Sequence, residues 1–218
     1  MTTPVETPAA VAPEFEVIGA TVRRHAAAPA IDFDVHVSEP SGRQVYAIAL
    51  TAQVMLEPAR RRYDAETHAR LEEMFGRAEG WATPNNVLWH QADALVPSFT
   101  GATTFRVAVP VSLDMEVGSA KYLSGLEDGE VPLAFNFNGT VHYRETDGRL
   151  QLSLVPWSCS ASFRMPVATW RQAVDHYFPH ARWISLHAET LAALQAEKRA
   201  RGLPTLDATV AGLLEERS

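Results

Sequence analysis

Apolar side chains occupy every second position from Phe105 to Val117, and this spacing is the strongest constraint on how the chain folds. A helix cannot bury such a series, because helical side chains return to one face roughly every 3.6 residues, whereas alternate residues of a strand share a face. The segment therefore predicts a half-buried β-strand. Pro110 falls on the opposite parity and cannot donate a ladder hydrogen bond, which favours an edge strand or a bulge there.

Further strands are predicted by the same alternation. They cover Phe15–Val17, Ile31–Val37, Leu133–Tyr143, Leu150–Leu154 and Phe163–Val167. Val45–Leu56 is apolar at both parities, which predicts a central strand covered on both faces. Asp147 and Gly148 separate two alternating runs and predict a hairpin turn.

Helical signals are short and gather toward the end of the chain. Asp64 is placed to cap a helix that ends before Gly76, and residues 119–126 predict one or two helical turns. After Val167 the pattern predicts a helix ended by Pro179, a second over about 187–201, and a third capped by Thr205. The fold class is therefore mainly β (α+β): an antiparallel β-sandwich or strongly bent sheet of about seven strands with short helices at the C-terminal end.

Domain organisation follows from composition. Residues 1–13 contain three prolines without periodicity, which predicts a flexible tail. The remaining residues, 14–218, predict a single globular domain that is β-rich over 14–167 and helical over 168–218. A chain of 218 residues can bury roughly 70% of its unfolded surface, so it needs no disulfide or metal to be stable.

The net charge of −7 argues against nucleic acid as a partner, because affinity for nucleic acid depends on neutralising phosphates. The single cysteine, Cys159, excludes an intramolecular disulfide and a thiolate metal cluster. No signal-peptide pattern and no apolar run of about 18 residues occurs, so we expect a cytoplasmic protein with no membrane association. The sequence leaves a homo-oligomer open.

Candidate catalytic and metal-binding groups are few. His176, His180 and His187 are the densest histidine cluster, but Pro179 interrupts the helix that would align them, so we predict no metal there. His90 and Asp93 could form an acid–base pair with Cys159 or Ser98 as nucleophile, although neither nucleophile lies in a strand-to-helix elbow.

Paired acids on predicted strands suggest a solvent-facing surface rather than calcium sites. The two pairs are Asp32 with Asp34 and Asp114 with Glu116. Glycine-rich phosphate loops are absent from the sequence, so no nucleotide or other cofactor is predicted.

A partner-binding site is predicted at Arg60, Arg61, Arg62, Trp89 and His90, in segments that resemble exposed loops. Loops carry recognition, and tryptophan and arginine are enriched at the energetic centres of interfaces. The five tryptophans, at positions 81, 89, 157, 170 and 183, lie mainly outside the cleanest strand patterns. They are either core anchors or interface anchors.

Several runs resemble an uncharacterised, mostly actinobacterial protein family. These are Glu57-Pro-Ala-Arg-Arg-Arg-Tyr63, Leu88-Trp-His90, Val96-Pro-Ser-Phe-Thr-Gly101, Ala120-Lys-Tyr-Leu123, Asp128-Gly-Glu-Val-Pro-Leu133, Val155-Pro-Trp157, Tyr177-Phe-Pro179 and Gly202-Leu-Pro-Thr205. The family is associated with gene neighbourhoods of uptake [NiFe]-hydrogenases, so the resemblance implies an accessory or assembly role. It brings no catalytic residues.

The sequence therefore favours a non-catalytic interaction or accessory protein, whose protein partner would be a hydrogenase subunit or assembly intermediate. Two alternatives stay open. One is a small module that binds an apolar ligand within the sandwich or in the cleft between sheet and helices. The other is a hydrolase-like enzyme that uses the His90 and Asp93 pair or the C-terminal histidines.

Overall fold

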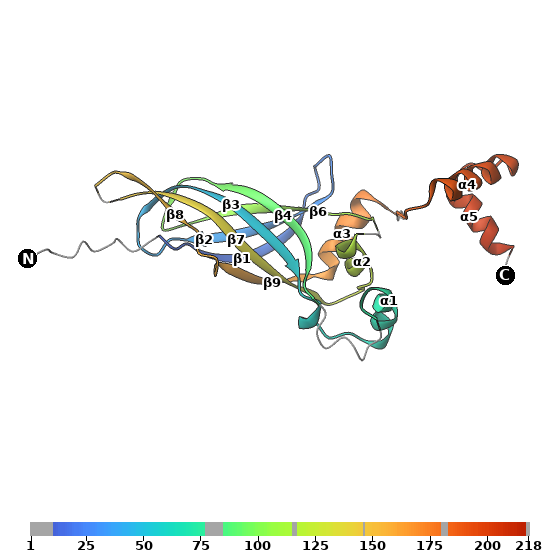
Figure 1. Cartoon of the computed structure of the whole chain (residues 1–218), viewed down its shortest axis with the longest axis horizontal. Coiled ribbons are helices and arrows are strands. Elements are labelled where there is room, and N and C mark those ends of the chain that lie inside the picture. Colours follow the sequence, from blue (N-terminus) through green and yellow to red (C-terminus); the bar gives the residue numbers. More distant parts are fainter. Residues whose placement is uncertain (1–10, 77–84, 115–116, 146, 180–182, 217–218) are drawn as a thin grey trace, which may run out of the picture.

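The computed structural model describes residues 11–76, 85–114, 117–145, 147–179 and 183–216, and it confirms a mostly β fold of two antiparallel sheets (Figure 1). The strands are β1 (Glu14–Val22), β2 (Ala30–Ser38), β3 (Gln44–Leu56), β4 (Val87–Val96), β5 (Phe99–Thr100), β6 (Ala102–Pro110), β7 (Glu130–Arg144), β8 (Leu150–Leu154) and β9 (Ser160–Pro166). The helices are η1 (Pro58–Arg60), α1 (Ala65–Phe75), α2 (Gly118–Ser124), α3 (Val167–Tyr177), α4 (Ala188–Ala200) and α5 (Leu206–Glu215).

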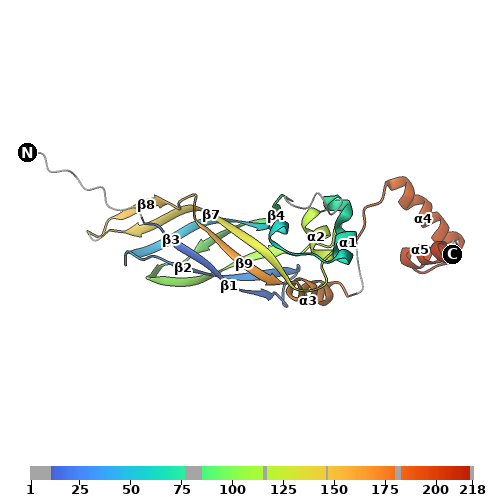
Figure 2. The same cartoon turned by 90° about the horizontal axis from the view of Figure 1, so that it is seen from below.

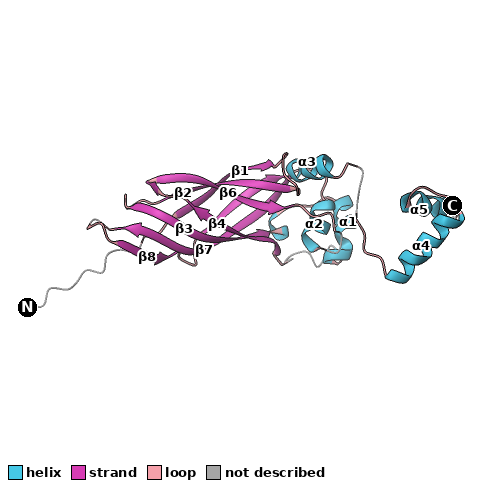
Figure 3. Ribbon diagram, turned by 90° about the horizontal axis from the view of Figure 1, so that it is seen from above, coloured by secondary structure: helices cyan, strands magenta, loops and turns pink. Residues whose placement is uncertain are grey.

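The two sheets lie face to face as a sandwich (Figure 3). One has three strands in the order β1-β2-β6, and the other has six strands in the order β4-β3-β7-β8, with β5 paired to β3 and β9 paired to β7. Aromatic rings fill the interior, where Phe33 of β2 meets Phe135 of β7 at 5.1 Å and Phe163 of β9 at 6.1 Å. Rings from opposite sheets therefore form the core.

The strand β6 confirms the edge position predicted from Pro110. Among the strands that the structure describes, it pairs only with β2, and Pro110 is its last residue. Val111 and Leu113 are buried beyond the end of the strand. The alternation therefore extends further along the sequence than the hydrogen-bonded ladder does.

The central position of β3 is confirmed, but the prediction that both its faces are covered is wrong. From Ile48 onward, buried residues alternate with partly exposed or exposed ones. A register shift between Val45 and Ala47 puts Tyr46, which is exposed, at a bulge. The bulge and the small alanines on the outer face explain why both parities look apolar in the sequence.

The strand β4 was not predicted. Its pairing with β3 shifts between Val54 and Met55, so that His90 lies opposite Val54, Leu88 lies opposite Met55, and Trp89 is the extra residue. Because a bulge breaks the period of two, the segment looked like a loop. Both β4 and the two-residue β5 add to the seven strands expected.

Ordered structure begins before the expected start near Phe15. Val11 is buried in the core, and its carbonyl accepts a hydrogen bond from the Ser153 hydroxyl at 3.2 Å. The Pro13 carbonyl accepts one from Cys159 at 3.4 Å. The end of the predicted tail is therefore part of the sandwich, because Val11 belongs to the hydrophobic core cluster. Residues 1–10 lie outside the described residues.

Local capping explains where α1 begins and ends and where α5 begins. The Asp64 carboxylate accepts a hydrogen bond from the Thr67 amide at 2.7 Å at the start of α1, and Gly76 ends the helix with a φ of 74°. The Thr205 hydroxyl accepts one from the Ala208 amide at 3.0 Å at the start of α5. These caps confirm the predicted helix boundaries.

The last two helices pack on each other and lie away from the sandwich (Figures 1 and 2). Arg201 bridges them, because its guanidinium binds Glu197 at the end of α4 and Glu216 after α5. No residue of α4 is buried. The single globular domain over residues 14–218 stays a prediction; among the described residues, the hydrophobic core cluster includes none from α4 or α5. Among the described helices, none is long and apolar enough to cross a membrane.

Candidate protein-binding surface

The three arginines predicted to bind a partner have different environments. The Arg61 side chain is only 10% exposed and donates hydrogen bonds to the carbonyls of Asp128 at 2.8 Å and Glu130 at 2.9 Å. Its guanidinium also lies 5.7 Å from the centre of the Tyr63 ring. Arg61 therefore ties the segment after η1 to the start of β7, and its donors are directed at this chain rather than at a partner.

The neighbouring arginines are accessible. Arg60 donates a hydrogen bond to Glu57 at 2.9 Å while most of its side chain stays in solvent, and Arg62 is exposed. Exposed ion pairs of this kind contribute little to stability. The run is therefore two solvent-facing cations on either side of a structural one.

Trp89 and His90 lie in β4 rather than in a loop. The Trp89 ring packs against the core and meets Phe33 edge-on at 6.0 Å. His90 lies opposite the buried Val54, and burial lowers the pKa of its imidazole. The predicted loop location is wrong for both residues, and Trp89 is at least partly a core residue.

The predicted acid–base pair is divided between the two faces of the six-stranded sheet. His90 is paired with the inward-facing Val54, and Asp93, three residues later, has the opposite parity. The Asp93 carboxylate accepts a hydrogen bond from Thr51 at 2.7 Å on the outer face. His90 and Asp93 are therefore not arranged as a catalytic dyad.

The two candidate nucleophiles are occupied by backbone groups. The Ser98 hydroxyl donates to the Val45 carbonyl at 3.0 Å, and the Cys159 thiol donates to the Pro13 carbonyl. Burial raises the pKa of Cys159, which disfavours the reactive thiolate.

Within the described residues, the histidines considered as metal ligands do not come together as a complete metal site. His176 contacts the Arg24 carbonyl at 3.1 Å, and His187 is the N-cap residue of α4, while His180 lies outside the described residues. In the part of the chain that the structure covers, no three His, Cys, Asp or Glu residues are grouped to hold an ion.

Of the two acid pairs on strands, the first is bound to arginines and the second is only partly described. Asp32 binds Arg23, and Asp34 binds Arg106 at 2.9 Å, so each carboxylate of the first pair faces a cation. Asp114 forms an isolated bridge to Trp183, and Glu116 lies outside the described residues.

A different surface of the sandwich gathers strongly exposed leucines. On the outer face of the six-stranded sheet, residues from four strands lie in one row: Leu95 of β4, Ala49 of β3, Thr140 of β7 and Leu154 of β8. The next rows pair His142 with Leu152 and Arg144 with Leu150. We call Leu95, Leu150, Leu152 and Leu154 the leucine face.

These four side chains are strongly exposed. Leu95 is 72%, Leu150 56%, Leu152 63% and Leu154 76% exposed. Ala49, which is small, lies between Leu95 and Leu154, and a shallow hollow of about 380 Å³ runs along Ala49, Thr51, Asp93 and Leu95. Exposed apolar side chains gathered on one sheet face are typical of a protein-binding surface.

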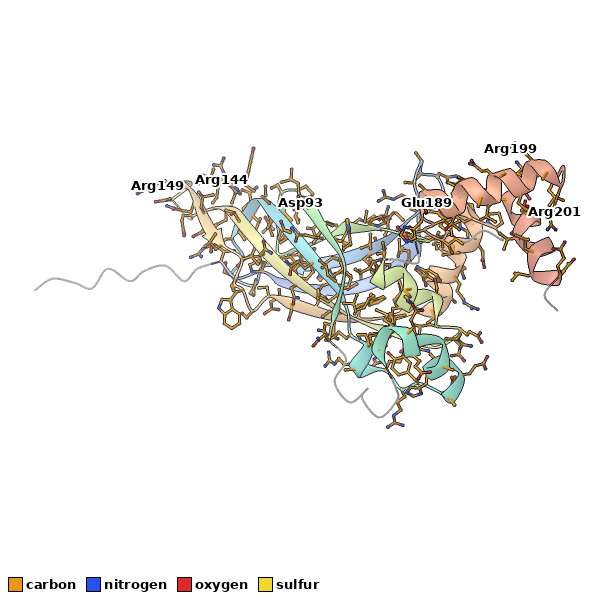
Figure 4. All side chains as sticks on the ribbon, turned by 45° about the vertical axis from the view of Figure 1, so that its right-hand side comes forward. Asp93, Arg144, Arg149, Glu189, Arg199 and Arg201 are labelled. Carbon is orange, nitrogen blue, oxygen red and sulfur yellow. The ribbon has the colours of Figure 1, made fainter. Side chains whose placement is uncertain are left out.

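Beside Leu95 the outer face is polar for two rows, before Met55 and the exposed Leu88 make it apolar again. Asp93 and Thr51 are hydrogen-bonded to each other, and the next row pairs Gln91 with Gln53. In Figure 4, Asp93 lies on β4 between the two ends of the molecule, and Arg144 and Arg149 lie together at the tip of the β7–β8 hairpin. The leucine face thus has a polar border on one side and arginines on the other.

The tryptophans divide between core and surface. Trp170 is buried, whereas Trp157, in the loop between β8 and β9, is 95% exposed, and Trp183 is also exposed. Trp81 lies outside the described residues. Trp157 is thus the tryptophan closest in sequence to the leucine face.

The sequence contains a signal for this face. The backbone amide of Glu145 donates to the Arg149 carbonyl, and Gly148 has a φ of 83°. This is the geometry of a three-residue hairpin loop with a glycine in the left-handed region. That loop length sets Leu152 opposite His142 rather than opposite the buried Tyr143. Pairing the residues of β7 and β8 in order from this turn therefore places Leu150, Leu152 and Leu154 on the outer face.

Comparison with solved structures finds remote likenesses. A β-glucosidase 3B from Thermotoga neapolitana in complex with α-D-glucose is 10% identical with a TM-score of 0.27, over 71% of this chain and 17% of that one. A β-glucosidase from Kluyveromyces marxianus gives 9% and 0.25, over 71% and 15%. The structural-genomics target SoR45 gives 8% and 0.22, over 71% and 83%. This chain thus spans less than a fifth of the glucosidases it matches.

A search of curated proteins finds no significant sequence match. The chain matches a family of unknown function (DUF6084) over residues 10–218, and it belongs to that family.

Proposed function

We propose that this DUF6084 protein is a non-catalytic accessory protein that binds another protein through the leucine face. The observation that carries the proposal is the exposure of Leu95, Leu150, Leu152 and Leu154 on one face of the six-stranded sheet. Fully burying an exposed leucine contributes up to about 1.5–3 kcal/mol. A partner that covers these four side chains would gain part of about 6–12 kcal/mol, and because association itself costs about 4–15 kcal/mol, contacts beside the leucines must contribute as well.

The environment of the leucines supports a protein partner. The surface is shallow rather than enclosed, with alanines in its middle and polar residues beside it. Small apolar ligands favour enclosed cavities, and the space between the sheets is filled by the rings around Phe33. The apolar-ligand alternative therefore gains no support.

The hydrolase-like alternative also gains no support. His90 and Asp93 have opposite parity on β4, and the hydroxyl of Ser98 is bonded to a backbone carbonyl.

The partner we propose is a subunit of an uptake [NiFe]-hydrogenase or an intermediate in its assembly. The support is the resemblance of runs such as Glu57–Tyr63 and Asp128–Leu133 to a family associated with those gene neighbourhoods. An accessory role is compatible with an apolar docking surface, because such proteins hold incomplete subunits by the apolar area that assembly later covers.

The test is affinity purification of the tagged full-length protein from a hydrogenase-producing host. We compare the wild type with Leu95→Glu and Leu154→Glu, which place a carboxylate at the two ends of the row. Ile18→Glu is the matched control, because Ile18 is 54% exposed but belongs to β1 in the other sheet. Because a carboxylate at a buried contact is unpaired and desolvated, we expect recovery of the hydrogenase subunit to fall at least tenfold in both leucine variants.

Recovery should be unchanged in Ile18→Glu. Circular dichroism and melting temperature establish that each variant is folded. Equal recovery in all four proteins would refute the leucine face as the binding surface. A stoichiometric partner that is unrelated to hydrogenase would refute the partner assignment while leaving the surface in place.

A further inference from the structure

The strand β8 has an open edge. Its one strand partner among the described residues is β7. Natural proteins protect such edges with charged residues, prolines or bulges, because an unpaired edge can pair with another chain. The five residues of β8, Leu-Gln-Leu-Ser-Leu, include no charge and no proline.

Hydrogen bonds at both ends of β8 identify which backbone groups are free. The Val155 amide donates to the Gly139 carbonyl at 3.0 Å, and the Arg149 carbonyl accepts from the Glu145 amide at 2.9 Å. Both residues have odd numbers, and backbone groups of a strand alternate between its two sides. The amides and carbonyls of Leu150, Leu152 and Leu154 therefore point away from β7.

The open edge of β8 carries both donors and acceptors, so it can pair with an identical edge. The same three leucines that carry exposed side chains also carry the free backbone groups. Arg149 lies just before β8 with its side chain 78% exposed, and Trp157, which is 95% exposed, follows it. In an antiparallel pair of two such edges, the arginine of each copy approaches the tryptophan of the other, as in a cation–π contact.

We propose that a second copy of the chain pairs antiparallel with β8 about a two-fold axis through Leu152. Leu152 then faces Leu152 of the second copy, and Leu150 faces Leu154 of the second copy. Facing residues exchange both of their backbone hydrogen bonds, as in any antiparallel ladder. The two six-stranded sheets become one continuous sheet, and their leucine faces adjoin on its outer side.

Symmetry favours a second copy over an unrelated strand. A two-fold axis satisfies all the outward groups of both strands at once, because the same edge serves on both sides. A parallel arrangement would put Arg149 beside Arg149 of the second copy, which is repulsive, whereas the antiparallel one separates them. The proposal uses the backbone edge, so it stands independently of the partner that covers the leucine side chains.

The experiment measures the mass of the purified full-length protein by light scattering and sedimentation over about 1–100 µM. We expect a dimer for the wild type. Leu152→Arg places two cations at the hydrogen-bonded-pair spacing of about 5.5 Å, so we expect a monomer. Leu95→Arg is the matched control, since Leu95 is at least as exposed but lies on β4, and this variant should remain a dimer.

Two further variants test the register and the backbone. Leu152→Pro removes an amide that points away from β7, so it should weaken dimerisation at least tenfold while the fold, checked by circular dichroism, survives. Leu152→Cys should form a symmetric disulfide under mild oxidation, because a Cα separation of about 5.5 Å lies within disulfide range. Leu95→Cys should not.

A monomeric wild type, a dimer insensitive to Leu152→Arg, or a Leu152→Cys protein that cross-links no faster than Leu95→Cys would overturn the proposal. A monomeric wild type refutes the dimer whatever Leu152→Pro does to partner recovery, because Leu152 also belongs to the leucine face and its side chain is lost in that variant. Loss of the dimer with partner recovery retained leaves the proposed function intact. Failure of the dimer proposal can therefore be distinguished from failure of the proposed function.

Discussion

Replacement of Arg61 by alanine should destabilise the fold rather than abolish partner binding directly. The side chain is nearly buried and donates two hydrogen bonds to backbone carbonyls of Asp128 and Glu130. Hydrogen bonds from a charged group contribute about 1.5–3 kcal/mol each, and water can reach these exposed carbonyls in the variant. We therefore expect a loss of about 2–3 kcal/mol in the free energy of unfolding, below the sum of about 3–6 kcal/mol for the two bonds because water replaces part of them.

That loss should lower the melting temperature by about 4–12 °C, because each kcal/mol corresponds to about 2–4 °C for a domain of this size. Urea unfolding and thermal melting measure it. Arg62→Ala is the control, since Arg62 is exposed and should change stability by less than about 0.5 kcal/mol. Arg61→Lys should fall between them, because an ammonium group cannot reproduce the fork of a guanidinium. If Arg61→Ala melts within about 1 °C of the wild type and loses partner recovery, then Arg61 is a binding residue and the structural interpretation fails.

Three further outcomes are expected. Gly139→Ala should lower the urea midpoint by an amount equivalent to about 3 kcal/mol, because a Cβ there would lie 2.0 Å from the Ala49 carbonyl oxygen; an unchanged midpoint would contradict this. Tyr63→Phe should destabilise more than Tyr122→Phe. The Tyr63 hydroxyl donates to a backbone carbonyl and so accepts from the fully buried Tyr122, whose hydroxyl the first change leaves without its acceptor at a cost of about 1–3 kcal/mol, measurable in a double-mutant cycle. Because burial lowers the pKa of His90 below 6.5, the folded state binds fewer protons than the unfolded one. Its stability should therefore fall as the pH drops through 6.5 toward the lower folded pKa, and His90→Gln should flatten that part of the melting-temperature profile.

Regular alternation made most of the sandwich predictable. Where strands keep their register, as β2 and β6 do along their whole pairing, side-chain parity follows the ladder and the buried residues can be identified. Caps were equally informative, since Asp64 and Thr205 supply hydrogen bonds that depend only on local sequence. These features need no knowledge of the rest of the fold.

Bulges account for the strand that was missed. Trp89 is the extra residue opposite β3, so the residues before and after it change parity and the segment loses its period of two. A sequence pattern cannot indicate a bulge whose position depends on the partner strand. The same difficulty hid the structural role of Arg61, because its acceptors at Asp128 and Glu130 are more than sixty residues away.

The two short strands β8 and β9 pair with the same side of β7, and this arrangement affects local motion. Residues 130–136 pair with β9 and residues 140–144 pair with β8, so the β8 ladder can open without disturbing the β9 ladder. Little apolar burial opposes this opening, since the leucines of β8 face outward. Amide hydrogens of Gln151 and Ser153 should therefore exchange by local opening, long before those of β3, which exchange only on global unfolding. A bound second copy would slow that exchange, so the hairpin would be most mobile in the free protein and ordered by its own association.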